Sequence, residues 1–250
     1  MSLRVFVPID AGAVAVGADT VAAALAQAAA ARSIAIDIVR TGSRGLYWLE
    51  PMVEVATSAG RVAFGPVRVS DVASLLDAIA GNGPHPLQLG MADEISWLKR
   101  QTRLTFARCG VIDPRSIEDY RAHGGYRGLE RALTLGADAI IEDVTASGLR
   151  GRGGAGFPTG IKWKTVAQAR AGRKFIVCNA DEGDSGTFAD RMILEGDPFL
   201  VIEGMTIAGI AVGATKGYIY IRSEYPHAVI AVKAAVAAAR RGGLLGARIG

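Results

Sequence analysis

The segment SGLRGRGGAGFPTGIKW concentrates residue types that suit a flat or phosphorylated ligand. Arg150, Arg152 and Lys162 can neutralise phosphate, and Phe157 offers a ring face to an aromatic base. Because its glycines lack a Cβ, the backbone can approach such a ligand closely and present its amides to it. These glycines are Gly148, Gly151, Gly153, Gly154, Gly156 and Gly160. The segment is therefore the first candidate for a binding loop.

The same segment contains a generic GxGxxG pattern at Gly151, Gly153 and Gly156. A dinucleotide-binding Rossmann turn requires a strand before this pattern and an acidic residue about twenty positions later at a strand end. Neither is evident here, so the pattern does not indicate a Rossmann turn. The alternative is a flexible glycine-rich surface loop, but such loops rarely combine two Arg, a Lys, a Phe and a Trp.

A second polar segment, NADEGDSGTFADR, directly follows the apolar run KFIVC. It places Asn179, Asp181, Glu182 and Asp184 at the carboxyl end of a predicted strand, where α/β proteins bind ligands. Asn suits a flavin or nicotinamide edge, and carboxylates suit ribose hydroxyls or ring N–H groups. The alternative is a solvated acidic turn in which Asp184 and Ser185 cap a helix, and both interpretations can hold together.

The N-terminal 80 residues predict a small α/β domain that opens with a β-α-β unit. Its expected elements are a strand at 3–9, a helix at 19–32, a strand in IAIDIV, two strands at 52–57 and 61–64, and a helix from Asp71 to Ile79. The glycines and prolines of GNGPHPLQLG predict a linker near residues 81–90.

The remainder predicts connecting helices followed by a second α/β domain. Helical spacing is expected over 97–107 and 116–135, and a long helix is expected to end near Ala214. Strands in KFIVCNA and YIYIR alternate with helices, the last of them at 227–240, which favours a mostly parallel sheet. The predicted domains are therefore 1–80, a connecting region at 81–139, and 140–250.

Composition excludes several functional classes. Lys and Arg total 28 against 24 Asp and Glu, and no basic run is interleaved with aromatics, so nucleic-acid binding is not expected. The two cysteines, Cys109 and Cys178, supply neither a disulfide framework nor a four-thiolate metal site and are expected to be core thiols. His85, His123 and His227 suggest no catalysis. The absence of a signal-peptide pattern and of an 18-residue apolar run predicts a cytoplasmic protein without a membrane span.

The glycine-rich and acidic segments, in this order, closely resemble the flavoprotein family that includes the NADH-oxidising 51-kDa subunit of respiratory complex I. The family also includes the diaphorase subunit of NAD-reducing hydrogenases and the β subunit of soluble formate dehydrogenases. The resemblance covers roughly residues 90–250, including QTRLTFARCGVIDP and LEGDPFLVIEGM. The sequence DEGDSGTFADR looks most like the formate dehydrogenase branch.

The resemblance implies a binding site for FMN and NAD(H). The residues implied to contact FMN are Gly151, Arg152, Gly153, Gly154, Lys162, Asn179, Asp181 and Glu182. NAD(H) is implied to pack against Phe157, with Glu182 or Asp184 near the nicotinamide and its ribose as the catalytic candidates. Complex I relatives carry a second aromatic residue three positions after the Lys, where this sequence has Thr165, so the adenine side of the pocket departs from the family pattern.

The implied reaction is hydride transfer between nicotinamide C4 and flavin N5, followed by one-electron steps to iron–sulfur clusters. In a formate dehydrogenase, formate and NAD⁺ would give CO₂ and NADH, with a molybdenum- and iron–sulfur-containing α subunit and a small [2Fe–2S] thioredoxin-like γ subunit as partners. Hydrogenase or complex I partners are the alternative, and a redox-inactive assembly subunit is an alternative of another class. A membrane-associated ferredoxin:NAD oxidoreductase component is disfavoured because NADEGDSG departs from its Asn-Gly-Ala-Glu-Cys segment.

The first domain resembles the thioredoxin-like ferredoxin module of some relatives, but the cysteines that hold a [2Fe–2S] cluster are absent. Ser43 and Tyr47 occupy the positions of a C-x3-C pair, which implies a scaffold with a docking role. The family also carries a Gly-Glu-Glu segment, a ubiquitin-like domain and four [4Fe–4S] cysteines towards its C-terminus. None is recognised in these 250 residues, so the sequence predicts a fragment that binds FMN incompletely, and it leaves NAD versus NADP open.

Overall fold

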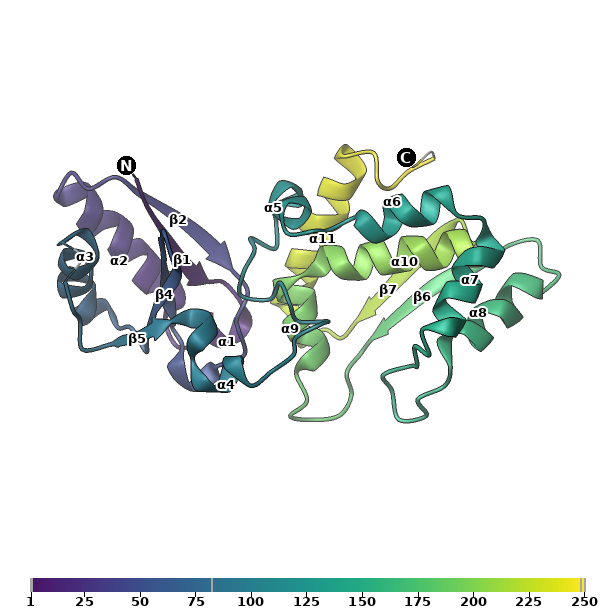
Figure 1. The fold of residues 1–250 in the computed structure, drawn as a ribbon, viewed down its shortest axis with the longest axis horizontal. Coiled ribbons are helices and arrows are strands. Elements are labelled where there is room, and N and C mark those ends of the chain that lie inside the picture. Colours follow the sequence, from purple (N-terminus) through teal and green to yellow (C-terminus); the bar gives the residue numbers. More distant parts are fainter. Residues whose placement is uncertain (1, 82, 248, 250) are drawn as a thin grey trace. The chain divides into compact units, whose positions relative to one another are not determined.

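The computed structural model describes residues 2–81, 83–247 and 249, and its chain forms two compact units (Figure 1). The first unit comprises Met1–Pro114 with Glu195–Asp197, and the second comprises Arg115–Leu194 with Pro198–Gly250. The chain therefore divides at Pro114, inside the connecting region that the sequence predicts at 81–139. The boundaries predicted for the three domains remain a sequence-based proposal.

The first unit is built on a five-stranded mixed sheet in the order β2-β1-β3-β4-β5. Strands β1 and β2 are parallel, and β3, β4 and β5 each pair antiparallel with their neighbour. This β-α-β unit followed by a hairpin and a helix confirms the predicted thioredoxin-like arrangement. Its strands are β1 (Leu3–Pro8), β2 (Ile36–Thr41), β3 (Val53–Thr57), β4 (Gly60–Phe64) and β5 (Gln88–Met91). Its helices are α1 (Ala11–Ala15), α2 (Ala18–Ala31), α3 (Val72–Gly81), α4 (Ser96–Lys99) and the 3₁₀ turns η1 (Tyr47–Leu49), η2 (Val69–Asp71) and η3 (Ala92–Glu94).

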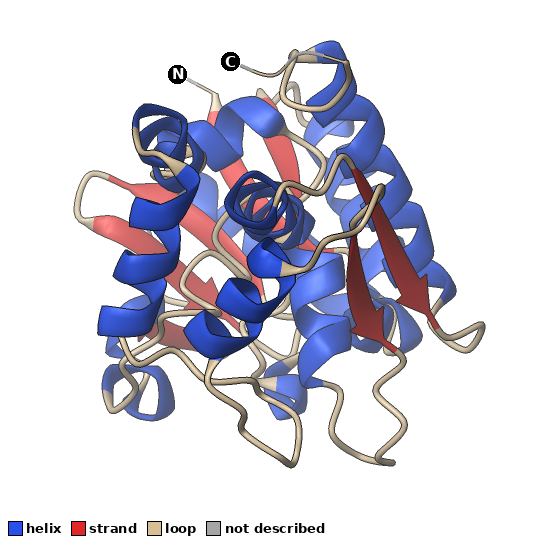
Figure 2. Cartoon of the chain, turned by 90° about the vertical axis from the view of Figure 1, so that its right-hand side faces the viewer, coloured by secondary structure: helices blue, strands red, loops and turns tan. Residues whose placement is uncertain are grey.

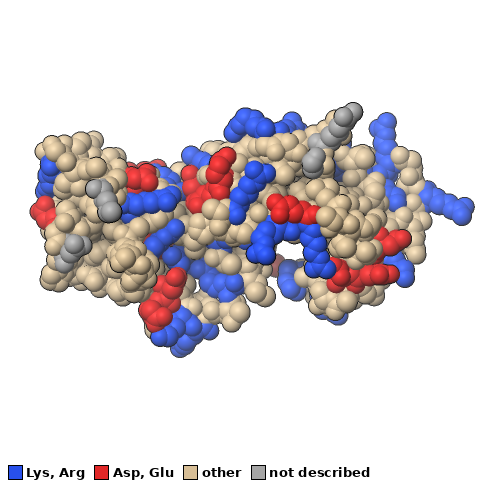
Figure 3. Space-filling model, turned by 45° about the horizontal axis from the view of Figure 1, so that its top comes forward, with Lys and Arg blue, Asp and Glu red and all other residues tan. Residues whose placement is uncertain are grey.

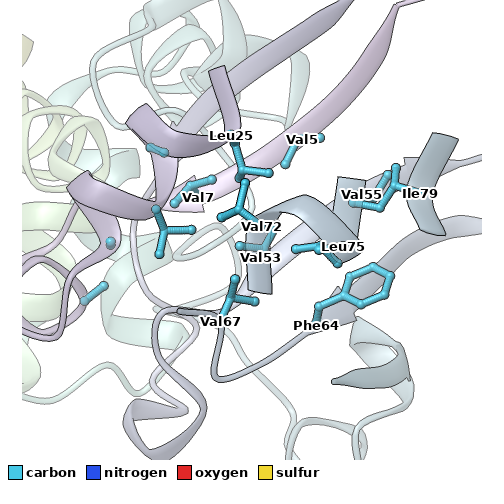
Figure 4. Close-up of a cluster of buried hydrophobic side chains, with 14 residues drawn as sticks. Val5, Val7, Leu25, Val53, Val55, Phe64, Val67, Val72, Leu75 and Ile79 are labelled. Carbon is cyan, nitrogen blue, oxygen red and sulfur yellow. The ribbon is translucent and has the colours of Figure 1, made fainter. Parts of the chain in front are cut away.

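The core of this unit forms where α2 and α3 cover the sheet (Figure 4). Alternate strand residues such as Val5 and Val7 point to the same face and meet Leu25 of α2 and Leu75 of α3, all of them fully buried. The predicted strands with alternating apolar residues and the predicted amphipathic helices therefore form this core as expected. Each buries its apolar side between the sheet and the helices.

Two expectations for residues 81–107 are wrong. The LQLG end of the predicted linker forms β5, because Gln88–Met91 pairs with the open edge of β4. The predicted helix over 97–107 stops as α4 at Lys99. Beyond it the chain makes separate turns, such as Ala107 N–H to Leu104 O at 3.3 Å, while Cys109 and Ile112 become fully buried. The burial of these two residues in the folded protein therefore decides the backbone conformation here, and the local helix propensity does not.

A hydrogen-bonded polar network occupies the region around the expected C-x3-C positions. The hydroxyl of Ser43 donates to Glu50 Oε1 at 2.7 Å, and the guanidinium of Arg44 donates to both carboxylate oxygens of Glu54 at 2.6 and 2.8 Å. Among the described residues, no group of three or more His, Cys, Asp or Glu side chains is placed to hold a metal ion. These side chains therefore hydrogen-bond one another, and the loss of a cluster stays a prediction from the sequence.

Glu50 gives this unit a distinct pH response. Burial raises the pKa of its carboxyl to about 7, although the N–H of Met52 and the Ser43 hydroxyl stabilise the charged form. Between the ordinary value of 4.5 and about 7, the folded chain holds a proton that the unfolded chain releases. The contribution of protonated Glu50 to the free energy of unfolding is therefore complete below pH 4.5. It is lost as the pH rises to about 7, by at most about 1.4 kcal/mol per pH unit.

We expect Glu50→Gln to remove this slope, whereas the wild-type chain retains it. Urea unfolding between about pH 4.5 and 8 measures it, and Glu94→Gln, on the exposed side of the same unit, is the matched control. Equal slopes in wild type and Glu50→Gln would show that the Glu50 carboxyl titrates alike in the folded and unfolded chain.

The second unit contains a two-stranded parallel sheet with helices packed against one face (Figure 1). Its strands are β6 (Phe175–Ala180) and β7 (Lys216–Ile221). Its helices are α5 (Ile117–Ala122), α6 (Arg127–Thr134), α7 (Ala137–Ala146), α8 (Thr159–Gln168), α9 (Ala189–Gly196), α10 (Pro198–Val212) and α11 (Pro226–Arg241), and the last two residues of α9 belong to the first unit. The predicted α/β class with parallel strands is confirmed here.

The two faces of this sheet differ in burial. The inner face packs Ile176 against residues of α10 and Ile219 against a cluster that includes Val232 of α11. Figure 2 shows the two strands running side by side, with helices behind them. The outer face leaves apolar side chains exposed, including Val177 at 65% and Tyr220 at 60%. Because parallel sheets are normally covered on both faces, this outer face is unusual for a parallel pair.

Two predicted helices are each interrupted in the structure. The helix expected over 116–135 divides into α5 and α6, because Gly124 and Tyr126 adopt left-handed conformations with φ of 80° and 64°. The long helix expected to end near Ala214 divides into α9 and α10 at Pro198, which has no N–H to continue the first helix.

The buried carboxylate of Glu203 on α10 holds the turn between α5 and α6. It accepts hydrogen bonds from the Tyr120 hydroxyl at 2.5 Å, the Tyr126 N–H at 2.8 Å and the Leu129 N–H at 2.9 Å. Removal of the carboxylate would take this acceptor away from all three donors, and each lost hydrogen bond of a buried group costs about 1–3 kcal/mol.

Glu203→Gln is therefore expected to lower the free energy of unfolding by about 2 kcal/mol, since the amide nitrogen replaces one of the two accepting oxygens and cannot itself accept a hydrogen bond. Urea unfolding followed by far-UV circular dichroism measures the loss. Glu142→Gln on the exposed side of α7 is the control and should change the value by less than about 0.5 kcal/mol. Equal stability of the two variants would contradict the role assigned to Glu203.

The surface carries both charge signs. Figure 3 shows Lys and Arg interspersed with Asp and Glu on the face in view, in keeping with a net charge of only +4. Within the part of the chain that the structure describes, every helix is too short or too polar to cross a membrane.

Candidate functional site

The glycine-rich segment forms a closed loop between α7 and α8. Its two ends are tied by hydrogen bonds from Gly151 N–H to Phe157 O at 2.8 Å and from Thr159 N–H to Leu149 O at 2.9 Å. A helix, α7, precedes the loop, and a single bridge joins Arg150 to Pro158. The structure thus agrees with the rejection of a Rossmann turn, which requires a preceding strand, and it shows a pinned loop instead of an unconstrained one.

The tip of this loop is open. A Cβ built on Gly153 or Gly154 would have no atom within 4 Å, whereas one on Gly160 would lie 2.1 Å from Thr145 Oγ1. Gly160 is therefore needed for α7 and α8 to pack, while Gly153 and Gly154 leave free space on the solvent side. Gly148 and Gly156 have φ of 67° and 52°, which favours glycine at both turns of the loop.

The loop and the first turn of α8 carry cations without carboxylate partners. Among the described residues, no Asp or Glu lies within ion-pair distance of Arg150, Arg152 or Lys162. Phe157 is 47% exposed, so its ring is accessible. Positive side chains, open backbone and an accessible ring together favour an anionic, aromatic ligand, as the sequence predicts.

The carboxyl end of β6 positions two of the acidic-segment candidates. Asn179 is exposed on the outer face of the sheet, and its Oδ1 accepts the N–H of Asp181 at 3.2 Å. Ala180 between them is buried, so the strand alternation turns Asn179 outward and fixes the start of the following segment. Asp181 is partly exposed beyond the strand end.

Glu182 has a structural task that the sequence does not reveal. It adopts a left-handed conformation with φ of 49°, and its carboxylate accepts the N–H groups of Asp190 at 2.7 Å and Arg191 at 3.1 Å. It thereby caps the N-terminus of α9. The alternative that Asp184 and Ser185 cap this helix is wrong, because Asp184 instead accepts the Thr187 N–H through its main-chain oxygen at 3.4 Å.

The end of β7 contributes residues that the sequence analysis did not select. Asn179 pairs with Tyr220 across the parallel sheet, so Tyr220, Arg222 and Glu224 lie at the same edge as the end of β6. Arg222 pairs with Glu224 at 3.0 Å, and this hydrogen bond lowers the pKa of the Glu224 carboxyl to about 2. The run YIYIRSEYP offered a signal, because carboxyl ends of neighbouring parallel strands share one edge.

Packing joins the two predicted segments into one region. Trp163 of α8 and Ile176 of β6 belong to the same apolar cluster beneath the sheet. Figure 1 shows the loop before α8 and the loop after β6 at the same lower end of the second unit, and Figure 2 shows them there as well. The structure therefore brings both sets of candidate residues to one end of this unit.

The cysteines do not extend the site. Burial raises the pKa of the Cys109 thiol to about 12, so it stays protonated and inert. Burial also raises the pKa of Cys178, whose side chain faces the apolar cluster on the inner side of β6. Both positions fit the expectation of core thiols.

Comparison with known proteins agrees with this picture of the second unit. Residues 144–249 match the family model described as the Nuo51 FMN-binding domain of the complex I 51-kDa group. The NADP-reducing hydrogenase subunit HndC of Solidesulfovibrio fructosivorans is 54% identical over 151 residues, which cover 60% of this chain and 31% of the relative. A subunit of the NADH-quinone oxidoreductase of Aquifex aeolicus is 50% identical over 134 residues, covering 54% and 31%. The chain thus spans about a third of the length of these relatives.

Among solved structures, an NAD⁺-reducing [NiFe]-hydrogenase in the air-oxidised state aligns with 96% of this chain and 41% of its own. The TM-score is 0.45 at 24% identity.

Proposed function

We propose that this chain, whose residues 144–249 match the Nuo51 FMN-binding domain model, is the flavin- and NAD(H)-binding part of a diaphorase subunit. The observation that carries the proposal is the open loop tip at Gly153 and Gly154, on a segment whose cations Arg152 and Lys162 have no carboxylate partner among the described residues. The family match supports it, since it includes this loop and the end of β6.

The residues present fit FMN as the bound group. Arg152 and Lys162 would hold its phosphate, the amides at Gly153 and Gly154 would approach it, and Asn179 and Asp181 would hydrogen-bond the ring edge. The chemistry that bound FMN supplies is exchange of a hydride with nicotinamide and of single electrons with iron–sulfur clusters. The protein groups therefore bind and orient, and no protein nucleophile is required.

NAD(H) is proposed to stack on the exposed ring of Phe157, with Asp184 near the ribose. We also propose that Glu182 lies near the nicotinamide. Because its carboxylate caps the N-terminus of α9, it has a positioning role as well. Thr165 lies exposed on α8, so an aromatic side chain is not available there for the adenine.

For the source of electrons, both relatives favour a hydrogenase or a complex I assembly, because they are named as subunits of those enzymes. The more specific proposal, a β subunit of NAD-dependent formate dehydrogenase with a molybdenum-containing α subunit and a [2Fe–2S] γ subunit, stays a prediction from the sequence DEGDSGTFADR. A cytoplasmic location and a [4Fe–4S] cluster in a longer form are likewise proposals.

Dye reduction with the purified natural enzyme tests the proposal. NADH should reduce a viologen or quinone dye only when FMN is retained, which establishes the diaphorase half-reaction. Formate, hydrogen and NADPH are then supplied separately to the assembled complex. Dye reduction by formate would support the formate dehydrogenase prediction, whereas dye reduction by hydrogen would favour a hydrogenase assembly. If neither NADH nor NADPH reduces the dye, the diaphorase proposal is wrong.

An assembly subunit without redox activity is the second candidate, favoured by the polar network that stands in place of cluster ligands around Ser43. It predicts intact complexes that contain no flavin at this chain. Flavin extraction from the complex therefore separates the two candidates, because bound FMN contradicts the assembly role and its absence contradicts the diaphorase role.

A further inference from the structure

Arg222, just beyond β7, reaches across to the segment that follows β6. Its Nη1 donates to the main-chain oxygen of Glu182 at 3.0 Å, and its Nη2 donates to the Glu224 carboxylate at 3.0 Å. The guanidinium therefore joins the ends of both parallel strands. Because Glu224 stays ionised above pH values of about 2, this anchor persists throughout the neutral range.

Aromatic side chains complete the same arrangement. The guanidinium of Arg222 lies 5.4 Å from the centroid of the Tyr225 ring, and Tyr225 is buried. Arg191 lies 4.5 Å from the Phe188 ring centroid and 5.9 Å from that of Tyr225. Both ends of the loop are thus attached to one group of stacked side chains.

The attached loop is strained. Glu182 and Phe188 adopt left-handed conformations with φ of 49° and 52°, which are unfavourable for a residue that has a Cβ. Two strained positions in one loop persist only where the surroundings hold them. The hydrogen bonds to Glu182 from Arg222 and from the first turn of α9 are those surroundings.

We propose that Arg222 is a positioning residue that holds the acidic loop, residues 181–188, in its ligand-competent shape before any cofactor binds. Asp181 and Asp184 lie on this loop, so its shape decides where their carboxylates stand. The inference rests on the proposed function for the identity of the cofactor, but the preformed loop is a property of the chain without ligand.

The test uses the natural full-length protein with Arg222→Ala and Arg222→Lys, first without flavin. Amide hydrogen exchange within 181–191 should accelerate at least about tenfold in Arg222→Ala, because a link to Glu182 and the stacking on Tyr225 are lost. Lysine keeps the positive charge and can donate to one of the two acceptors but lacks the planar guanidinium that bridges both, so Arg222→Lys should recover part of the protection. The Kd for FMN should rise in the same order, also by about tenfold for the alanine variant.

Arg240→Ala, which removes an exposed cation from the last turn of α11, is the matched control and should leave both measurements unchanged. If Arg222→Ala exchanges at the wild-type rate within 181–191, the positioning role is wrong, whether or not flavin binds. If exchange accelerates but wild-type protein binds no FMN, the positioning role stands and the proposed function fails. Equal acceleration across the whole second unit would instead show a general structural role and overturn the inference.

Discussion

Gly154→Asp is expected to abolish FMN retention while the chain stays folded. A Cβ at this position meets no atom within 4 Å, so the ligand-free structure accommodates the new side chain. Its carboxylate would stand in the proposed approach of the flavin phosphate, and two like charges about 5 Å apart repel by about 3 kcal/mol, which weakens binding about 100-fold. Flavin content of the purified protein and its melting temperature give the two readouts.

Lys162→Ala provides an independent variant, because it removes a phosphate-side cation without adding bulk, and it should also lower the flavin content. Lys233→Ala removes an exposed cation from α11, far in the sequence from the glycine-rich loop, and serves as the control for the loss of one positive charge. Normal FMN content in both Gly154→Asp and Lys162→Ala would refute the assignment of the loop.

Gly160→Val should damage the fold instead of the binding chemistry. Alanine exceeds glycine by about 1 kcal/mol in helix propensity, so a glycine in the first turn of α8 needs a packing reason. A Cβ there would lie 2.1 Å from Thr145 Oγ1 and 2.7 Å from the Thr145 main chain, which forces α7 and α8 apart. We expect the free energy of unfolding to fall by about 3 kcal/mol.

Urea unfolding measures this change, and a second substitution separates its causes. Thr145→Ala in the Gly160→Val background removes the hydroxyl but leaves the clash with the main chain of α7, so it should restore only part of the stability. Full stability of Gly160→Val alone would show that the two helices can separate without loss, and would contradict the packing role.

Much of the first unit follows from sequence patterns alone. The apolar alternation of residues 52–57 and 61–64 around SAG predicts the hairpin that the structure contains as β3 and β4. Helix α2 begins at Ala18 and ends at Ala31, within a residue of the predicted 19–32. These elements bury one side on a shared core, so local pattern and tertiary environment agree.

The failures lie where distant partners decide the backbone. Gln88–Met91 becomes a strand only because β4 has an open edge, and the helix expected to end near Ala214 breaks where Pro198 lacks a donor. Glu182 shows the same limit in the site. Its residue type predicts a ligand contact, but only the structure reveals that its carboxylate caps α9 and that Arg222 holds its main chain.

The most direct test of the central claim is the visible spectrum of the natural full-length protein, recorded before and after NADH is added without air. The account predicts flavin absorbance that bleaches on addition of NADH and is missing from Gly154→Asp. Absence of flavin from the folded full-length protein, or flavin that NADH leaves oxidised, would contradict the claim that this chain exchanges electrons between NAD(H) and FMN.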